Sequence, residues 1–279
     1  MTSQDLYRIR DFVPDFDAIA AEFVDRSRAL SARAEMLPDI RYGSRPREVL
    51  DVILPPHPKV GAPLHIFVHG GYWRSGEKEN YRFVAAPVLA VGGVAALVEY
   101  DLMPGARLDV LVEQVRRSVL WLQQHARDFG ADPDRLTVSG HSAGAHLASF
   151  LASIGPAETE VPRLPTLKGL LLLSGIYDLS GIPDSFLRDE AKMTHAEAEA
   201  WSPVTATQLP CPIRVIGFGK EETLPFHAQA ASLQDKLQSG NQAVSILNIP
   251  DRNHMSVVLD LGDPDSALGR RLAAMVLES

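Results

Sequence analysis

The chain has 279 residues, of which 46% are hydrophobic, and a formal net charge of −8 at pH 7. This length suits one large α/β domain over 1–279, and no internal repeat or long linker divides it. Acidic residues outnumber basic residues, and the sequence has no basic stripe that could neutralise phosphates. A nucleic-acid partner is therefore not expected. Cys211 is the only cysteine, no signal-peptide pattern opens the chain, and no apolar run is long enough to span a bilayer. We therefore expect a cytoplasmic protein that does not associate with membranes.

The first segment, 1–38, is expected to be helical. Asp15 is expected to cap a helix in which Phe16, Ile19 and Phe23 recur at the spacing of one buried stripe. The sequence leaves open three roles for this helix: packing on its own sheet, covering the site entrance, or contacting a second subunit in a homodimer.

Strands and helices alternate through the rest of the chain. This alternation predicts an α/β fold with a mostly parallel central sheet and helices on both faces. The polar stretch 181–209 breaks the alternation, and it is expected to form either a small helical cap insertion over the site or an ordinary surface excursion. Apolar runs predict the strands at 49–54, 64–68, 94–100, 135–139, 168–174, 213–218 and 244–249, and helical periodicity predicts helices at 81–91, 108–129, 143–153 and 226–237.

The segment LTVSGHSAGAHL at 136–147 places Ser142 in a G-x-S-x-G pattern between a predicted strand and a predicted helix. This context is typical of a nucleophile elbow, a sharp turn that exposes a serine hydroxyl at the end of a strand. Gly140 and Gly144 leave room for neighbouring backbone, so Ser142 is expected at a positive φ. The context disfavours the alternative, a glycine-serine loop without chemistry.

A serine hydroxyl needs a base to take its proton, and the base needs a third group to hold its tautomer. His254 follows the last predicted strand, where its side chain can reach the strand ends, so it is the predicted base. The acid is expected in the loop after 213–218, where Glu222 is preferred and Glu221 is the alternative. Asp178, after the preceding strand, is a further alternative, and both glutamates also suit the positive end of the next helix.

The segment HGGYW at 69–73 follows a predicted strand and is expected to supply an oxyanion hole. The backbone N–H groups of Gly71, Tyr72 and Ala143 are the predicted donors, because fixed N–H groups need no reorganisation when negative charge develops. Tyr72 and Trp73 are expected to offer flat apolar walls, which makes Trp73 a predicted substrate-binding residue. The alternative is a tight Gly-Gly turn followed by core aromatic residues.

The sequence carries no motif for a metal or a dinucleotide. No H-E-x-x-H, C-x-x-C or EF-hand loop is present, and no G-x-G-x-x-G follows the first predicted strand. His141 and His146 are five residues apart at a helix start, and this spacing does not place them on one face. We expect neither a metal nor a cofactor.

Three segments carry a family resemblance: HGGYW at 69–73, GHSAGAHL at 140–147 and LSGIYDL at 173–179. They resemble the α/β-hydrolase fold and, within it, the kynurenine formamidase (arylformamidase) family and its esterase relatives. The resemblance covers most of the chain, and it implies a catalytic triad and an oxyanion hole formed by Ser142, Glu222, His254, Gly71, Tyr72 and Ala143. A shared pattern of Glu222, Phe226 and Gln229 favours Glu222 over Glu221, although aspartate is the more usual acid in that family.

The main hypothesis is a serine hydrolase that removes a small acyl group, formyl in the first instance, from an aryl amide such as N-formylkynurenine. The first alternative keeps the same triad in a short-chain carboxylesterase of broad specificity. The second alternative, from another class, is a non-catalytic ligand-binding member of the fold, since a fold does not fix function. In the first two cases the partner is a small-molecule ester or amide.

Overall fold

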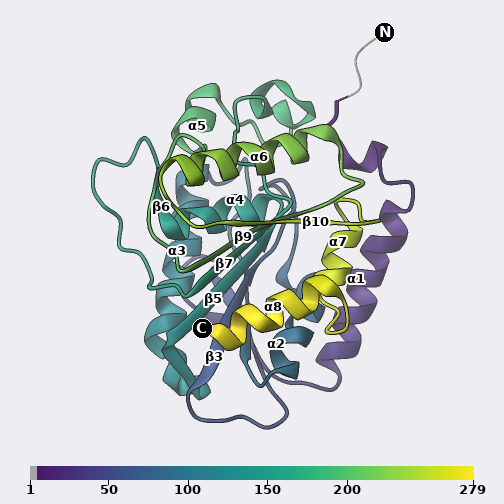
Figure 1. Ribbon diagram of the computed structural model, residues 1–279, viewed down its shortest axis with the longest axis vertical. Helices are drawn as coiled ribbons and strands as arrows, with labels where there is room; N and C mark the ends of the chain where they lie inside the picture. Colours follow the sequence, from purple (N-terminus) through teal and green to yellow (C-terminus); the bar gives the residue numbers. More distant parts are fainter. Residues whose placement is uncertain (1–4) are drawn as a thin grey trace.

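The computed structural model describes residues 5–279, so residues 1–4 of the predicted helical segment 1–38 lie outside the described part. Its centre is an eight-stranded sheet with the strand order β1-β2-β4-β3-β5-β7-β9-β10 (Figure 1). A separate two-stranded sheet pairs β6 with β8. The strands are β1 (Glu35–Arg41), β2 (Val49–Leu54), β3 (Ala62–Val68), β4 (Val94–Val98), β5 (Ala131–His141), β6 (Ser153–Ile154), β7 (Gly169–Leu173), β8 (Thr207–Gln208), β9 (Ile213–Gly219) and β10 (Ser245–Ile249).

The main sheet is parallel from β4 to β10, and β2 runs antiparallel to both of its neighbours. Helices α2 (Ala86–Ala90) and α8 (Ala267–Glu278) contact each other on one face, while α3 (Leu108–His125) and α4 (Ala143–Ser149) contact β5 from the other (Figure 1). This arrangement confirms the predicted fold class. The other helices are η1 (Ile9–Asp11), α1 (Phe16–Ser31), η2 (Lys78–Ala85), η3 (Ala126–Phe129), η4 (Phe150–Ala152), η5 (Ile182–Asp184), η6 (Phe186–Arg188), α5 (His195–Ala200), α6 (Leu224–Ser239) and α7 (Ser256–Leu261).

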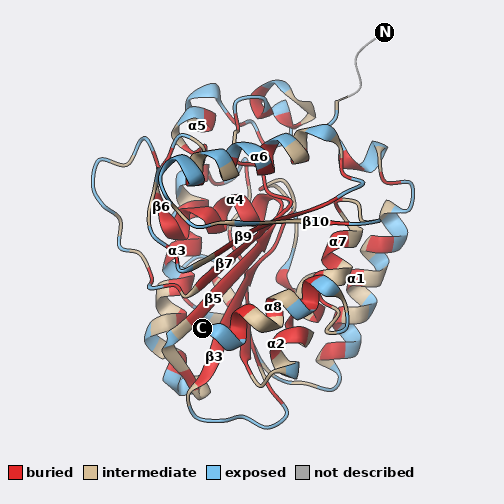
Figure 2. Cartoon of the chain, in the orientation of Figure 1, coloured by how far each residue is buried: buried red, intermediate tan, exposed pale blue. Residues whose placement is uncertain are grey.

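The core lies where the central strands carry unbroken apolar runs. Every residue of β3, β4 and β7 is buried (Figure 2). Strands buried on both faces do not alternate between apolar and polar residues, and this explains why continuous apolar runs located them in the sequence. No helix in the described part of the chain is both long and apolar enough to cross a membrane.

Two local predictions need correction. Asp15 precedes α1, but its side chain accepts no capping hydrogen bond. The segment 1–38 is not helical to its end, because β1 begins at Glu35 and pairs with β2. The sequence analysis missed β1, since this edge strand is mostly exposed and contains Pro38, and both features weaken a strand signal. Its pairing partner, rather than its own pattern, fixes it in the sheet.

The stretch 181–209 contains three short helical segments separated by turns and irregular backbone. It contains η5, η6 and α5, and then β8, which pairs with β6. Thr194 and Glu197 form a capping box at the start of α5, and this accounts for a helix of only six residues in a polar stretch. We continue to propose that this stretch acts as a small cap.

A buried ionic cluster joins β2 to the helix η2. The Asp51 carboxylate is fully buried and contacts Nζ of Lys78 at 2.9 Å and Nη2 of Arg82 at 2.7 Å. Lys78 also contacts Asp39, on the edge strand β1, at 2.8 Å. Because η2 begins a few residues after the HGGYW segment, this cluster holds the part of the chain that leads away from that segment.

Replacing Lys78 with alanine is expected to lower the free energy of unfolding by about 3 kcal/mol, because the Asp51 carboxylate would lose a cation while staying buried. Urea titration of the variant measures this. Arg28→Ala is the matched control, since Arg28 and Asp25 form an exposed pair and its loss should cost below about 0.5 kcal/mol. Equal losses in the two variants would contradict the role assigned to the cluster.

Candidate active site

Ser142 lies at the turn between β5 and α4 with φ 54° and ψ −120°, so the predicted positive φ is confirmed. The turn requires glycine on both sides. A Cβ atom at Gly144 would lie 2.1 Å from the Val68 carbonyl oxygen, and one at Gly140 would lie 2.4 Å from the Gly144 carbonyl oxygen. Any side chain at these positions would therefore push β3, β5 and α4 apart. The strained serine is kept in place because neighbouring backbone is packed this closely.

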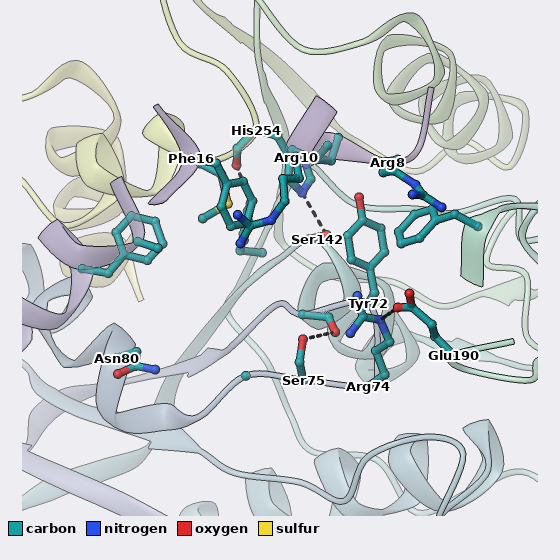
Figure 3. Close-up of a pocket in the computed structure, with 18 of the residues that line it drawn as sticks. Arg8, Arg10, Phe16, Tyr72, Arg74, Ser75, Asn80, Ser142, Glu190 and His254 are labelled. Atoms are coloured by element: carbon teal, nitrogen blue, oxygen red, sulfur yellow. Dashed lines mark hydrogen bonds and ion pairs between the residues drawn. The ribbon is translucent and has the colours of Figure 1, made fainter. Parts of the chain in front are cut away.

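Three side chains from distant parts of the chain meet at this turn. The Ser142 hydroxyl donates to Nε2 of His254 over 3.0 Å (Figure 3). Nδ1 of His254 contacts Oε2 of Glu222 at 2.8 Å. A carboxylate only accepts, so it fixes the tautomer with the proton on Nδ1 and leaves Nε2 free to accept. All three residues are buried. The arrangement can take a proton from a serine hydroxyl and return it to a leaving group.

The Glu222 carboxylate is held on its other oxygen. Oε1 accepts a hydrogen bond from the Ser174 hydroxyl and another from the Gly219 N–H, each over 2.6 Å. The sequence analysis missed Ser174, which follows β7 directly. A signal was present, because the loops after adjacent parallel strands meet at one edge of the sheet, and β7 and β9 are neighbours. Ser174 is therefore positioned to orient the acid.

The alternative acids lie elsewhere. Glu221 is exposed, and Asp178 accepts a hydrogen bond from the Ser180 N–H. The pattern that favoured Glu222 has a structural basis, since the Phe226 ring packs on the His254 ring at 4.3 Å. Gln229 accepts hydrogen bonds from the backbone after β7, at the N–H groups of Tyr177 and Asp178.

The HGGYW segment forms a tight loop beside the elbow. Gly71 and Tyr72 have φ values of 125° and 53°. The His69 ring anchors the loop, because Nε2 contacts the Glu99 carboxylate at 2.8 Å and Nδ1 contacts the Gly70 carbonyl at 2.7 Å. The Tyr72 N–H makes no backbone hydrogen bond within residues 5–279, and the Ala143 N–H is the first of α4, which has no partner inside a helix. Both donors are therefore free for an oxyanion.

Trp73 does not form a wall of the site, so that prediction is wrong. The indole is fully buried and donates a hydrogen bond to Nδ1 of His146 over 3.0 Å, and Nε2 of His146 in turn donates to the Trp201 carbonyl. Burial lowers the pKa of His146 to about 4, which keeps the ring neutral and able to accept from the indole. The alternative interpretation of Trp73 as a core aromatic residue holds, and the contact ties the HGGYW loop to the stretch 181–209.

A cavity of about 570 Å³ opens onto Ser142 and His254. Its walls are partly aromatic and include Tyr72 and Phe16 (Figure 3). Phe186 also lines it. Phe186 packs edge-on against Tyr72 at 5.2 Å. The leading helix α1 packs on η2, where Phe23 contacts Tyr81 and Phe83, and its first residue, Phe16, lines the cavity.

The segment 5–11, which we call the N-terminal strap, crosses the same cavity. Arg8 and Arg10 line it beside the aromatic walls (Figure 3). The strap is attached to three different loops by hydrogen bonds from the Tyr72 hydroxyl to the Tyr7 carbonyl, from the Thr223 hydroxyl to the Leu6 carbonyl and from the Phe186 N–H to the Asp5 carboxylate.

Comparison with known proteins identifies relatives of this chain. The BD-FAE family matches residues 50–237, more than half of the chain. A kynurenine formamidase of Danio rerio is 33% identical over 91% of this chain and 86% of its own. Esterase LipQ of Mycobacterium tuberculosis is 26% identical over 77% of this chain and 56% of its own. The structure of esterase B from Lactobacillus rhamnosis, inhibited by a tributyrin phosphonate, has a TM-score of 0.71 and 19% identity, with 94% of each chain covered.

The fold and the site together define an α/β-hydrolase, a serine hydrolase of the arylformamidase and esterase type. Within that class, the chain belongs to the BD-FAE family and to the kynurenine formamidase family. The chain is thus an enzyme, and the interpretation as a non-catalytic ligand-binding protein is set aside. The individual roles of Ser142, Glu222 and His254 stay predictions.

Replacing His254 with asparagine is expected to lower kcat/KM on an activated ester by about 10⁴-fold or more, because the Ser142 hydroxyl would lose the imidazole nitrogen that accepts its proton. Steady-state kinetics measures the loss, and circular dichroism checks that the variant is folded. Undiminished turnover by a folded variant would contradict the predicted base.

Ser174→Ala should lower kcat/KM by about tenfold, because the Glu222 carboxylate would keep only the Gly219 N–H on Oε1. Ser153→Ala is the matched control, since its buried hydroxyl donates to the Ser149 carbonyl, away from the three side chains. Titration of the site by a fluorophosphonate corrects both rates for active enzyme. A Ser174 variant that behaves like the Ser153 variant would remove Ser174 from the positioning role.

Proposed function

We propose that the enzyme removes a formyl group from an aryl amide such as N-formylkynurenine, through an acyl-enzyme on Ser142. The observation that supports this most is the buried Ser142–His254–Glu222 chain of hydrogen bonds on a partly aromatic cavity. A volume of about 570 Å³ lies within the range typical of small-molecule sites. The aromatic walls suit a flat aryl leaving group.

The proposed reaction uses the groups in order. The Ser142 hydroxyl attacks the formyl carbon while Nε2 of His254 takes its proton. The N–H groups of Tyr72, Gly71 and Ala143 stabilise the oxyanion that forms. His254 then gives the proton to the leaving nitrogen, the C–N bond breaks, and the aryl amine departs.

The second half of the reaction releases formate. A water molecule attacks the formyl ester on Ser142, His254 takes its proton, and the serine is restored as the leaving oxygen regains a proton. Glu222 keeps the imidazole in one tautomer throughout, and it stabilises the imidazolium formed in each half.

A short-chain carboxylesterase is the second candidate. The same three side chains cleave an ester as well as an amide, and the similarity to esterase LipQ favours this reading. The two functions differ in the bond and in the acyl group: the first takes formyl amides, and the second takes longer acyl esters.

The wild-type enzyme is expected to show a kcat/KM on N-formylkynurenine at least about tenfold above that on p-nitrophenyl esters with acyl chains of four or more carbons, because pockets discriminate by acyl size. A series from p-nitrophenyl acetate upward measures the acyl preference. A marked preference for the longer esters would favour the carboxylesterase and end the formamidase proposal.

A further inference from the structure

The lining of the cavity is more basic than the protein as a whole. Its charged residues, apart from histidine, are the arginines Arg8, Arg10 and Arg74 and the acids Asp11 and Glu190. The lining therefore carries one formal positive charge, with histidine counted as neutral, whereas the whole chain carries −8. A cleft lined by positive charge raises the local concentration of anions. The cavity thus favours a substrate that carries negative charge.

Two of the three arginines already have a carboxylate partner. Arg10 contacts Asp17 at 2.8 Å, and Arg74 contacts Glu190 at 2.6 Å. The Arg8 side chain forms neither an ion pair nor a hydrogen bond within residues 5–279, and residues 1–4 contain no acidic residue. Among the arginines of the cavity, Arg8 is therefore the one whose charge a ligand can still neutralise.

An aromatic ring, rather than an acid, holds the Arg8 side chain. The guanidinium lies over the Phe186 ring, with Cζ 5.1 Å from the ring centre. Asp5, also in the strap, uses its carboxylate to accept hydrogen bonds from the N–H groups of Tyr7 and Phe186. A hydrocarbon ring offers no oxygen acceptor, so the guanidinium N–H groups stay available for bidentate binding of a carboxylate. Arg8 is exposed, and a ligand in the cavity can therefore reach it.

Aromatic contacts lead from the catalytic turn to Arg8. Tyr72 lines the cavity together with Ser142, and its ring packs against Phe186 at 5.2 Å. In the view of Figure 3 the Tyr72 ring is drawn between Ser142 and Arg8. An aryl group that packs on Tyr72 and Phe186 while Ser142 attacks its amide would therefore direct a ring substituent toward Arg8.

We propose that Arg8 binds a carboxylate on the leaving aryl group, so that the enzyme prefers anionic aryl amides. This inference rests on the proposed aryl amide hydrolysis at the same site, and it adds the chemical class of the leaving group. The carboxylate is remote from the scissile bond, so its contact is the same before the attack and in the tetrahedral intermediate. Binding of this kind lowers KM and leaves kcat nearly unchanged.

Two formamides that differ by one carboxylate test this on the full-length enzyme. N-Formylkynurenine carries a carboxylate on the substituent of its ring, and N-formylkynuramine has the same formamide, ring and amine without it. We expect the wild-type kcat/KM to be about tenfold higher on N-formylkynurenine, mainly through a lower KM, because the charged hydrogen bond is lost with the other substrate. Equal values on two cleaved formamides would overturn the inference and leave the proposed function standing.

The ratio of the two kcat/KM values is the quantity to compare among variants, because it cancels any loss of folded enzyme. Arg8→Gln should remove most of the preference, whereas Arg8→Lys should keep part of it, since lysine retains the charge without the paired donors. Arg33→Gln is the matched control, because Arg33 is exposed and does not line the cavity. A full preference in Arg8→Gln, or a larger loss in Arg10→Gln, would overturn the inference.

Salt separates a charge effect from a packing effect of Arg8 on Phe186. The wild-type preference should weaken as NaCl is added, because exposed charges are screened. The ratio in Arg8→Gln should not depend on salt. A wild-type preference that does not change with salt would contradict the assignment of Arg8 as the anion-binding residue.

The amine products test the same contact without any cleavage of a formamide. Kynurenine and kynuramine differ by the same carboxylate, and inhibition of p-nitrophenyl acetate hydrolysis measures their binding. Kynurenine should bind about tenfold more tightly to the wild type but not to Arg8→Gln. Equal inhibition constants in the wild type would overturn the inference. An enzyme that hydrolyses p-nitrophenyl acetate but neither formamide would overturn the proposed function, and the inhibition constants would still decide the role of Arg8.

Discussion

The backbone turn at Ser142 is the constraint on which the rest of the site depends. It holds a non-glycine residue at φ 54°, and this strain persists because β3, β5 and α4 approach too closely for the chain to relax. The turn directs the hydroxyl toward His254, and α4 begins at the next residue, so its first N–H directly follows the serine. In the proposed mechanism, the strained bend therefore sets both the direction of attack and one of the donors that meet the resulting charge.

Sequence alone predicted the central part of the fold, and the reason is physical. The strands of a parallel sheet are covered on both faces, so every residue of β4 and β7 is buried. In the sequence these strands are therefore short continuous apolar runs, which distinguishes them from half-exposed elements. The elbow and the late histidine follow from this, since parallel strands bring the loops at their carboxyl ends to one edge. The sequence therefore predicted that Ser142, Glu222 and His254 meet, and the structure brings them together.

What sequence could not predict depends on packing between distant segments. Trp73 and Tyr72 are adjacent aromatic residues after the same glycine pair, yet only Tyr72 lines the cavity. The indole turns inward because His146 offers it an acceptor, and no pattern in the sequence records that contact. Ser174 is a similar case, because a serine after a strand becomes informative only once the neighbouring strand is known. The strand β1 is also hard to find from its own residues, which are mostly exposed, because its place in the sheet comes from pairing with β2.

The N-terminal strap links the loops around the cavity. Its residues form hydrogen bonds with Tyr72, with Thr223 next to Glu222, and with Phe186 in the stretch 181–209. These three loops come from distant parts of the chain, and the strap is hydrogen-bonded to all of them. Opening the cavity at the strap would therefore break contacts with three loops rather than with one.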